Sequence, residues 1–498
     1  MLLSDEKLES FRTALRPLTL VIYTSSLLLD VMNSTGVTFI LPRVAEEYHL
    51  PYTEATWMLS AYALTFGAFL LVVGRLGDVV GHKEVYILGL TLFSVFSALA
   101  AGVNTAVGLF VVRAFQGAFA AMTVPSAYAL VSISYTGRAR EMALSMLGMG
   151  IATGSTVGII VGGAVTKLEV GYRLLFWISF ALSIVFALLS AILVPPTPRN
   201  LALFRRIDFF GTFLITASIL LIVLGLSEGP TDWQAARALS PLLVGIAMLA
   251  AFITYENIFL RRTSPSTEAL IPPRVWTFKN FAALVPVTAL MYGTCFMMLL
   301  VGSQFLVNVQ GKPALTAAIQ YLPFAIAPLI AMPILGALYS KINPKWTIMM
   351  GEILAIAGCI LFSRNDERTH YWSYSFPGLI LISLGVACFF VNFLNLAVAS
   401  APLPDQGLVA GIMQSAAQVS VAIFYAISGS FIDKATPQTI LSDYRNAFYC
   451  ATAAAAAALV ITAFLIHAPS RDESTHEAVP SATQQETEQE MEQDPALH

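Results

Sequence analysis

Charged side chains are scarce in this chain. Only 11% of its 498 residues are Asp, Glu, Lys or Arg, whereas 57% are hydrophobic. A soluble domain carries roughly a quarter charged residues, so this composition excludes a water-soluble globular fold. The mean hydropathy of +0.74 agrees with that exclusion. We therefore predict an all-α polytopic membrane protein, because helices satisfy their own backbone hydrogen bonds inside a bilayer.

Cysteine is equally scarce, and its positions suggest no chemistry. The four cysteines fall inside apolar runs without paired spacing: Cys295, Cys359, Cys388 and Cys450. This pattern predicts packing residues rather than disulfides or metal ligands. The sequence also lacks a His, Cys or carboxylate cluster with metal-ligand spacing and a phosphate-binding loop. We predict that the chain is not an enzyme and that it holds no metal or other cofactor.

The sequence is instead made up largely of long apolar runs. Fourteen runs of about 18 to 28 residues can be counted, each long enough to cross a hydrocarbon core of about 30 Å at 1.5 Å per residue. They cover residues 17–40, 55–74, 84–102, 106–133, 142–165, 174–195, 208–226, 239–260, 281–306, 315–339, 346–363, 375–400, 407–432 and 446–467. The first run is long enough to stay in the membrane rather than act as a cleavable signal peptide.

The charges that remain are distributed unevenly. With the N-terminus placed in the cytosol, cytosolic segments hold 17 Lys and Arg residues and outer segments hold nine, while Arg113 lies within an apolar run. The positive-inside rule therefore predicts that both termini are cytosolic. From Arg471 onward, one cation faces eight carboxylates. We expect residues 469–498 to form a disordered acidic tail.

A short polar stretch between the second and third runs has a distinctive pattern. Residues 74–83 read G-R-L-G-D-V-V-G-H-K, and the positions of interest are Gly74, Arg75, Gly77, Asp78, Gly81 and Lys83. The glycines allow a tight turn and a close approach to a neighbouring helix. The charged side chains are placed to bind one another or helix ends. The stretch resembles the signature loop between helices 2 and 3 of the major facilitator superfamily of secondary transporters, which implies a cytosolic gating loop.

An internal echo of this loop indicates the architecture. Residues 336–345 repeat its pattern, with Lys345 matching Lys83. Paired halves are usual in secondary transporters, and the resemblance implies the major facilitator fold, with two six-helix bundles and two inserted helices. The expected divisions are a cytosolic N-terminus (1–16), a first bundle (17–196), a linker with the two additional helices (197–280), a second bundle (281–468) and the acidic tail (469–498). We interpret the inserted pair as peripheral spacer helices rather than as part of the transport path.

The fourth run carries a cation inside the membrane. Residues 109–117 read L-F-V-V-R-A-F-Q-G and resemble the second motif of the family. Arg113 is costly at this depth unless it faces the protein interior and finds a partner there. Gln116 follows on the same helix face. We favour a functional role, and the alternative is a structural arginine bonded to backbone carbonyls.

The first run offers a partner for this arginine. Asp30 and Arg113 lie at similar depths, about 20 Å from the cytosolic side. A buried carboxylate beside a cation can carry a proton, because gaining or losing its partner changes its proton affinity. We hypothesise that Asp30 binds the coupling proton and that Arg113 modulates it. Asn33 stands where the similar first-helix motif of fourteen-span drug:proton antiporters has an aspartate, so Asp30, one turn earlier, can substitute for it.

The fifth run carries a stripe of glycines. They are Gly150, Gly154, Gly158, Gly162 and Gly163. Four-residue spacing leaves one bare helix face, which predicts close packing against another helix. The register is similar to a motif associated with antiporters, although Ile159 occupies its proline position. The resemblance favours export over uptake.

Several amides are candidates for the lining of a central cavity. They are Gln116, Gln304, Asn308, Asn392, Asn395, Gln414 and Gln418, with Phe389, Phe390 and Phe393 beside them. Amides cost more against lipid than against a wet cavity, so we expect them to point inward. They either contact substrate or hydrogen-bond to other helices. Glu352 is a second candidate proton site, although pairing with Lys345 is the interpretation that we favour.

The resemblance covers residues 17–467 and is closest to a fungal-type branch of the fourteen-span drug:proton antiporters, through residues 57–67. It implies a secondary active transporter that exports small amphiphilic organic compounds by alternating access. The alternative is an uptake carrier or facilitator for ammonium, borate or a nutrient, and a transporter-like receptor is less favoured.

We expect a small-molecule substrate, a lipid bilayer, no nucleic-acid partner, a functional monomer and a proton gradient instead of a cofactor. The plasma membrane is the expected location, with the vacuolar membrane as the alternative.

Overall fold

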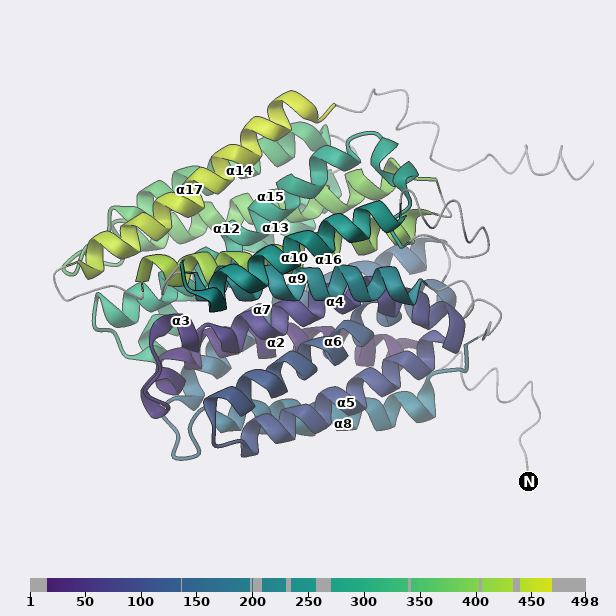
Figure 1. Ribbon diagram of the computed structural model, residues 1–498, viewed down its shortest axis with the longest axis horizontal. Helices are drawn as coiled ribbons and strands as arrows, with labels where there is room; N and C mark the ends of the chain where they lie inside the picture. The colour runs from purple at the N-terminus through teal and green to yellow at the C-terminus, as the bar shows by residue number, and fades with distance from the viewer. Residues whose placement is uncertain are drawn as a thin grey trace, which may run out of the picture.

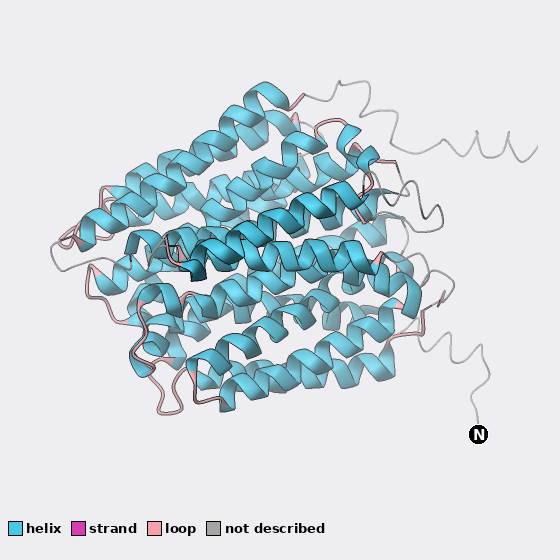
Figure 2. Cartoon of the chain, in the orientation of Figure 1, coloured by secondary structure: helices cyan, strands magenta, loops and turns pink. Residues whose placement is uncertain are grey.

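The computed structural model describes residues 16–135, 137–197, 199, 208–229, 234–256, 270–338, 342–402, 405–432 and 439–467. Within these residues every regular element is helical, and Figure 2 shows helices joined by loops. The acidic tail predicted for residues 469–498 lies outside the described residues, as does most of the linker that precedes the inserted helices.

The helices fall into two halves and an inserted pair (Figure 1). The first half contains α2 (Arg16–Glu47), α3 (Tyr52–Ala55), α4 (Trp57–Val80), α5 (His82–Gly102), α6 (Ala106–Ser134), α7 (Gly137–Val165) and α8 (Arg173–Leu193). The inserted helices are α9 (Phe209–Glu228) and α10 (Ala236–Thr254). The second half contains the 3₁₀ helix η3 (Pro273–Thr277), α12 (Phe281–Asn308), α13 (Ala314–Leu338), α14 (Pro344–Ser363), α15 (Ser375–Ala399), α16 (Gln406–Ile432) and α17 (Ile440–Leu465).

Polar caps and glycine set several of the helix ends. Thr105 accepts a hydrogen bond from the backbone N–H of Gly108 at the start of α6, and Asp208 does the same for Gly211 at the start of α9. Such caps satisfy amide groups that have no partner within the helix. Gly81, with φ of 110°, separates α4 from α5 in a backbone conformation that suits glycine.

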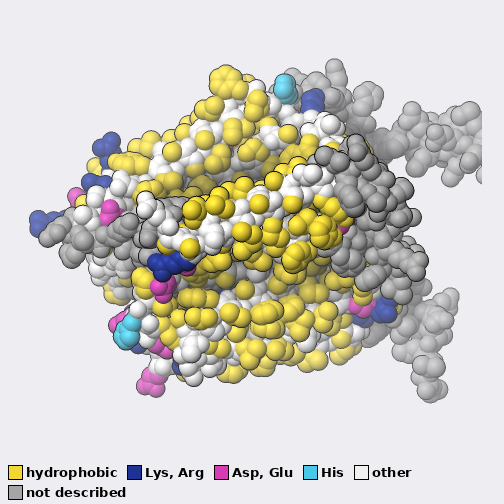
Figure 3. Space-filling view, viewed as in Figure 1, with side chains coloured by type: hydrophobic (Ala, Val, Ile, Leu, Met, Phe, Trp, Pro, Cys, Tyr) yellow, Lys and Arg dark blue, Asp and Glu magenta, His cyan; other side chains and the backbone are white. Residues whose placement is uncertain are grey.

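The length and polarity of the helices confirm the predicted polytopic membrane protein. Twelve of the described helices are long and apolar enough to cross a bilayer, and Trp57–Leu70 and Phe210–Leu226 are shorter apolar helical stretches. In Figure 3 hydrophobic side chains cover the middle of the visible face, whereas charged side chains gather near its two ends. The count of fourteen spans and the cytosolic location of both termini stay predictions.

Two helix pairs form the seam between the halves. Helix α4 packs along α16, and α7 packs along α13. Within the first half, α2 packs along α7 and α4 along α6. The second half has its own set of pairs, including α12 with α16 and α14 with α15. The seam therefore lies between α4 and α7 on one side and α16 and α13 on the other.

The inserted helices lie beside this seam. Helix α9 packs against both α4 and α16, and α10 packs against α9. In Figure 1 the pair crosses the front of the molecule between the two halves. Gly225 of α9 lies close to Leu242, and Gly245 of α10 lies close to Ile222, which brings the two helix backbones together. The pair is thus external to the bundles, as a spacer would be, while α9 contacts one helix from each half.

Candidate functional site

A buried guanidinium is the centre of the polar network in the first half. Arg113 on α6 is completely buried. Its Nη1 donates to Asn33 Oδ1 at 2.6 Å and to Gln116 Oε1 at 2.5 Å, and its Nε donates to the Met58 carbonyl at 3.0 Å. Its Nη2 atom is buried without a hydrogen-bond partner. Three bonds and one unused nitrogen leave this cation incompletely satisfied, which is unusual for a buried polar group.

Further hydrogen bonds orient the two amides that hold Arg113. Asn33 on α2 donates to Ser179 Oγ on α8 at 2.9 Å. Gln116 donates to Ser97 Oγ on α5 at 2.6 Å. Because each amide uses its nitrogen for a serine, its oxygen faces the guanidinium. The network therefore connects α2, α4, α5, α6 and α8, and it contains both Asn33 and Gln116 as functional partners of Arg113.

Asp30 joins this network through a tyrosine. The Tyr62 hydroxyl on α4 donates to Asp30 Oδ1. The Arg113 Cζ atom lies 4.2 Å from the centroid of the same tyrosine ring, a cation–π geometry. The direct partner of Arg113 in the first helix is therefore Asn33 rather than Asp30. Matching depths placed Asp30 and Arg113 at one level, but depth alone does not determine which way a side chain points around its helix.

Tyr62 is the functional residue that sequence reasoning missed. It lies in an apolar run and carries no charge, so a search for intramembrane ions passes over it. A signal was present, because tyrosine has an apolar ring and a hydroxyl that seeks a partner when buried. Its side chain is only 4% exposed.

The local packing of α4 and α6 places Tyr62 and Arg113 together. Thr65 Oγ1 on α4 donates to the Ala114 carbonyl on α6 at 2.6 Å. Gly117 faces the Tyr62 carbonyl so closely that a side chain there would collide with the backbone. A small residue at this position lets the two helices approach. Arg113 and Gly117, one turn apart, thus both face α4.

A small cavity lies beside Asp30. It is lined by Ser26, Leu29, Asp30, Leu90, Phe93, Ala120 and Thr123. The cavity lies among α2, α5 and α6, inside the first bundle. Its volume of about 10 Å³ is close to the space that one water molecule needs.

The two halves meet firmly near the end of the molecule that the sequence predicts to face outward. Gln304 on α12 is buried and donates to the Thr38 carbonyl on α2 at 3.1 Å. Phe39 and Tyr321 form an edge-to-face pair with ring centroids 6.1 Å apart. Gly163 on α7 lies against Ala318 on α13. These contacts close the outer end of the seam.

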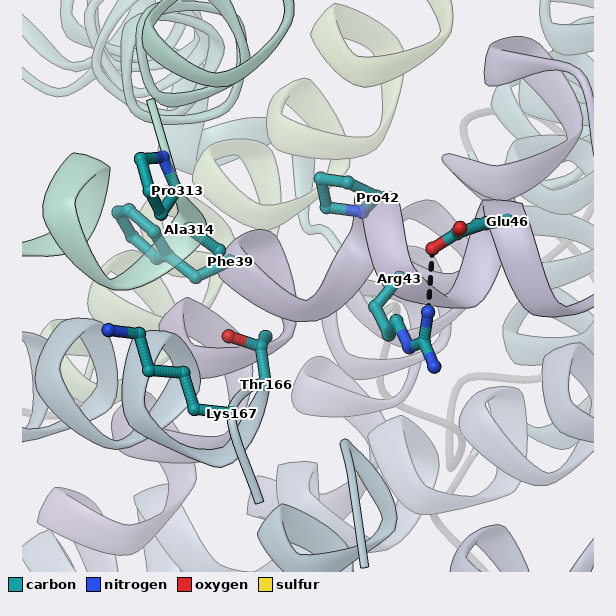
Figure 4. Close-up of a pocket in the computed structure, with 8 residues that line it drawn as sticks. All are labelled: Phe39, Pro42, Arg43, Glu46, Thr166, Lys167, Pro313 and Ala314. Carbon is teal, nitrogen blue, oxygen red and sulfur yellow. Dashed lines mark hydrogen bonds and ion pairs between the residues drawn. The ribbon is translucent and has the colours of Figure 1, made fainter. Parts of the chain in front are cut away.

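A pocket of about 300 Å³ lies outside this closure (Figure 4). Its lining comes from both halves: Phe39, Pro42, Arg43, Glu46, Thr166, Lys167, Pro313 and Ala314. Arg43 is bound to Glu46 at 2.7 Å, as the dashed line in Figure 4 marks. If the halves moved apart, the outer ends of α2 and α7 would therefore separate from the outer end of α13 at this pocket.

The middle of the seam is also closely packed. A Cβ at Gly67 would lie 2.9 Å from Gln418 Cβ across the seam. Toward the opposite end, a Cβ atom added at Gly74, Gly148, Gly336 or Gly407 would meet no described atom within 4 Å. These glycines belong to α4, α7, α13 and α16, the four helices of the seam. The close contacts between the halves that the structure describes therefore include the middle and the outer end.

The predicted gating loop is described only in part. Gly77 lies against the His82 ring, and Gly81 makes the turn into α5. Lys83 Nζ donates to the Ala191 carbonyl at 3.2 Å and to the Val194 carbonyl at 2.5 Å, which ties the loop to the end of α8. The side chains of Arg75 and Asp78 lie outside the described residues.

The amides proposed for a central cavity do not gather at one place. Asn308 donates to Tyr444 within the second half at 2.8 Å. Asn392 and Asn395 donate to carbonyls of their own helix, Cys388 at 2.8 Å and Val391 at 2.7 Å. These three amides are used in helix packing and backbone bonding, which is the structural alternative that the sequence left open.

Gln414 and a group of aromatic rings remain as a candidate contact surface for substrate. The Tyr292 hydroxyl donates to Gln414 Oε1 at 3.4 Å. The Tyr292 ring lies 4.4 Å from Phe390 and 5.7 Å from Phe393, measured between centroids. Phe389 stacks on Phe393 at 4.9 Å. The rings come from α12 and α15 and form a largely buried aromatic cluster beside Gln414.

The glycine stripe of α7 packs along α2. Gly150, Gly154, Gly158 and Gly162 lie against Thr24, Leu28, Met32 and Gly36, respectively. Both rows advance by four residues, so the two helices remain in contact over about three turns. Gly163 points the other way, toward α13.

Glu352 and the cysteines complete the set of residues singled out from the sequence. Glu352 is buried, and its Oε1 accepts a hydrogen bond from Thr462 on α17 at 2.6 Å. Lys345 donates instead to the Ala463 carbonyl at 2.9 Å, so the favoured pairing of Glu352 with Lys345 is wrong. The two residues lie about two turns apart on α14, and each bonds to a different group of α17. All four cysteines are free.

Comparison with known proteins places the chain among transporters. The Major Facilitator Superfamily model matches residues 24–364 and 284–496. The puromycin resistance protein pur8 of Streptomyces alboniger is 27% identical over 474 residues, covering 92% of each chain. The low affinity ammonium transporter of Saccharomyces cerevisiae is 26% identical over 400 residues, covering 76% of this chain and 73% of that protein.

A solved structure has the same fold. It is a bacterial homolog of the human lysosomal transporter Spinster in an inward-facing, unoccupied conformation, with a TM-score of 0.64 and 14% identity. The match covers 92% of this chain and 97% of that one.

Proposed function

The chain belongs to the major facilitator superfamily, and from this premise we propose that it exports small amphiphilic organic compounds in exchange for protons. Membership makes it a multi-pass membrane transporter rather than an enzyme. The observation that carries the proposal is the buried Arg113, with its unused Nη2 atom, one tyrosine ring away from Asp30 and its cavity.

The proton site supports exchange as follows. Asp30 takes a proton through the adjoining cavity and gives it up when its surroundings change. In its charged state the carboxylate accepts the Tyr62 hydroxyl and lies in the field of Arg113. Protonation removes that charge, which changes what holds α4 in place. Arg113 and Asn33 stay bonded to each other and keep the cation at the right depth.

The seam supports alternating access. Closure by Gln304, Phe39 and Gly163 at the outer end supports a carrier that opens toward the cytosol. A substrate would enter from that side and contact the Tyr292 and Phe390 surface. Release would require the outer contacts to part into the pocket beyond Phe39. The rings favour apolar and aromatic parts of a substrate.

The direction of transport rests on two observations. The glycine stripe of α7 is similar to a motif associated with antiporters, and a relative that spans 92% of this chain is named for puromycin resistance. Resistance by transport requires removal of the compound from the cell. We place the protein in the plasma membrane as a functional monomer, with the vacuolar membrane as the alternative location.

A second candidate function is uptake or facilitated passage of a small solute. The specific observation in its favour is the relative named a low affinity ammonium transporter. Asn33, neutral where an antiporter would carry an aspartate, also favours it. This candidate predicts that collapse of the proton gradient lowers or does not change the amount of solute inside the cell.

Accumulation of puromycin and ethidium in cells that express the protein separates the two functions. Export predicts low accumulation that rises several-fold when a protonophore is added, whereas cells with Asp30→Asn accumulate the compounds with or without it. The ammonium analogue methylammonium is the probe for uptake. Unchanged retention of puromycin and ethidium, combined with faster entry of methylammonium, would reject export.

A further inference from the structure

One side chain contacts both charged groups of the proton site. The Tyr62 hydroxyl donates to Asp30, and its ring lies under Arg113 at 4.2 Å. The hydrogen bonds of Arg113 go to Met58, Asn33 and Gln116. The shortest described connection between the carboxylate and the cation therefore passes through the tyrosine.

The same side chain lies close to the seam. Tyr62 stacks on Phe66, with ring centroids 6.1 Å apart and an interplanar angle of 27°. At Gly67, the next position, an added Cβ would lie 2.9 Å from Gln418 Cβ and 3.1 Å from Val419 N of α16. The distance from Tyr62 to the other half is thus less than two turns of one continuous helix. A change in the position of Tyr62 reaches the seam through α4 itself.

We propose that Tyr62 is the positioning residue that transmits the protonation of Asp30 to the seam between α4 and α16. The inference rests on the proposed proton site and states how protonation there would move α4 against α16. A hydrogen bond to a charged carboxylate is roughly twice as strong as one between neutral groups. When Asp30 gains a proton, the Tyr62 hydroxyl loses that stronger bond, while its ring stays on Arg113. Helix α4 then loses its charged hydrogen bond to α2, keeps its packing on α6 and can tilt against α16.

The surroundings of Asp30 contain few other groups that titrate. Tyr62 comes from α4 and Arg113 from α6. Tyr86 of α5 donates to Ser26 at 2.6 Å, one turn before Asp30 on α2. The charged residues of α7 and α8 that the structure describes lie at the ends of those helices, and the sequence of α12 has none. Tyr425 of α16 is a further titratable group described near Arg113. A pH response at this level can therefore be attributed to Asp30 and these neighbours.

The chain offers a matched pair of variants. Tyr62→Phe removes the hydroxyl that holds Asp30 and keeps the ring beneath Arg113. Tyr86→Phe removes a phenolic hydrogen bond of the same kind from the same cavity region, but one that ends on Ser26. If Tyr62 only filled space, the two variants would behave alike, because each loses one oxygen atom and leaves a buried ring.

The experiment follows the conformation of the full-length protein in lipid nanodiscs without substrate. Spin labels at Lys167→Cys and Lys312→Cys, on opposite halves at the outer end, report the distance between the halves from pH 5 to 9. The unaltered chain should change distance with pH. Loss of the donor disfavours the charged carboxylate, so Tyr62→Phe should move the midpoint upward by about one pH unit. Tyr86→Phe should leave it in place.

The outcomes separate the inference from the proposed proton site. A Tyr62→Phe midpoint that matches both Tyr86→Phe and the unaltered chain overturns the role of Tyr62, while the site stands if Asp30→Asn abolishes the pH response. A pH response that survives in Asp30→Asn overturns the proton site itself. A distance that never changes with pH in the unaltered chain overturns both. Retained folding of each variant is checked by its elution from a size-exclusion column.

Discussion

At the scale of single residues, Arg113 shows why a guanidinium occupies this position. Its Nε and Nη1 atoms reach three acceptors on three helices at once, Met58, Asn33 and Gln116. The ammonium of a lysine is one point with three donors and cannot reproduce a planar fork. The acceptors lie in the protein interior, where a lost hydrogen bond leaves a polar atom unpaired. The geometry therefore specifies arginine, beyond the requirement for a positive charge.

Arg113→Lys is predicted to reduce transport at least tenfold and to lower the free energy of unfolding by about 1–3 kcal/mol, the cost of unpaired buried acceptors. Initial rates of puromycin transport in proteoliposomes and thermal unfolding in detergent measure the two effects. The control is Arg237→Lys, because Arg237 is 59% exposed and its ion pair with Glu228 is long at 3.7 Å. That change should stay within about 0.5 kcal/mol. Equal behaviour of the two variants would contradict a special role for Arg113.

Sequence reasoning located the charged residues of the site but not their bonds. The cost of an ion in a membrane marks Arg113 and Asp30 without any structure, because few explanations other than function or pairing exist. The choice between Asn33 and Asp30 as the direct partner depends on rotation about the helix axis. Residues three apart share a face, so spacing alone could not decide between them. Tyr62 was not identified from the sequence, because a hydroxyl group in an apolar run is not as unusual as a charged group there.

At the scale of helices, the contact of α7 with α2 depends on bare glycines. A Cβ at Gly154 would lie 3.0 Å from Leu28 Cα, a backbone atom that cannot move alone. Gly154→Ala is predicted to lower the free energy of unfolding by about 1–3 kcal/mol, as overpacking does. The control is Gly148→Ala on the same helix, where no described atom lies within 4 Å. Its melting temperature should be unchanged or slightly higher, because alanine favours helix over glycine.

The comparison of these two variants is direct, since both add one methyl group to α7. Melting temperatures in a single detergent are the measurement. A Gly148→Ala variant that is destabilised as much as Gly154→Ala would mean that the loss comes from the membrane-facing helix surface. The predicted close packing of the stripe would then not be what makes glycine necessary at Gly154.

Helix boundaries were the most predictable feature of the fold. The observed α8 (Arg173–Leu193) and α15 (Ser375–Ala399) agree with the expected runs to within two residues. Hydrophobic length is a strong signal in a bilayer, since a span must cover the hydrocarbon core. The largest difference is at α2, which continues through Pro42 to Glu47. The expected run ended at residue 40, two residues before Pro42.

The loop at residues 74–83 gives a prediction at the element scale. The N-terminus of α16, near Gly407, carries a partial positive charge from its unpaired amides. By resemblance, Asp78 would bind there when the cytosolic end closes, and Gly407 meets no described atom within 4 Å in this conformation. Asp78→Asn should slow transport of puromycin several-fold and leave membrane insertion unchanged. Glu169→Gln, an exposed change at the opposite end, is the control. A normal rate in Asp78→Asn would exclude the contact.

At the scale of the whole molecule, the seam is what the sequence could not describe. Contacts such as Gln304 with Thr38 join residues that are 266 positions apart, and no periodicity or motif reports such a pairing. The amides expected in one cavity illustrate the same limit. That each of them avoids lipid stays a prediction, and Asn308 and Asn392 form their hydrogen bonds within their own half. The spacing of residues in a sequence can indicate which face of one helix points inward. A cavity depends on how several helices are arranged, which that spacing does not give.

The position of α9 affects how the two halves can move. It touches α4 and α16, the two helices that meet at Gly67, and it has one face on each half. A helix bound to both sides of a moving seam must slide along one of them or travel with it. The inserted pair therefore sets a limit on how far α4 and α16 can separate on that side. This makes the opposite pair, α7 and α13, the side on which the outer end can open.

Opening between α7 and α13 predicts the effect of a cross-link across the outer pocket. Thr166 and Ala314 line this pocket from opposite halves. Cysteines at both positions, joined by a short bifunctional thiol reagent, should abolish puromycin transport, and a reductant should restore it. Cys450→Ser removes the one native thiol that is not buried. The control joins Arg43→Cys to Thr166→Cys, which line the same pocket from α2 and α7 of one half. Because those helices move together, transport should persist in the control. Loss of transport with both cross-links would mean that the reagent blocks the pocket. Persistence of transport with both cross-links would mean that the halves do not part there.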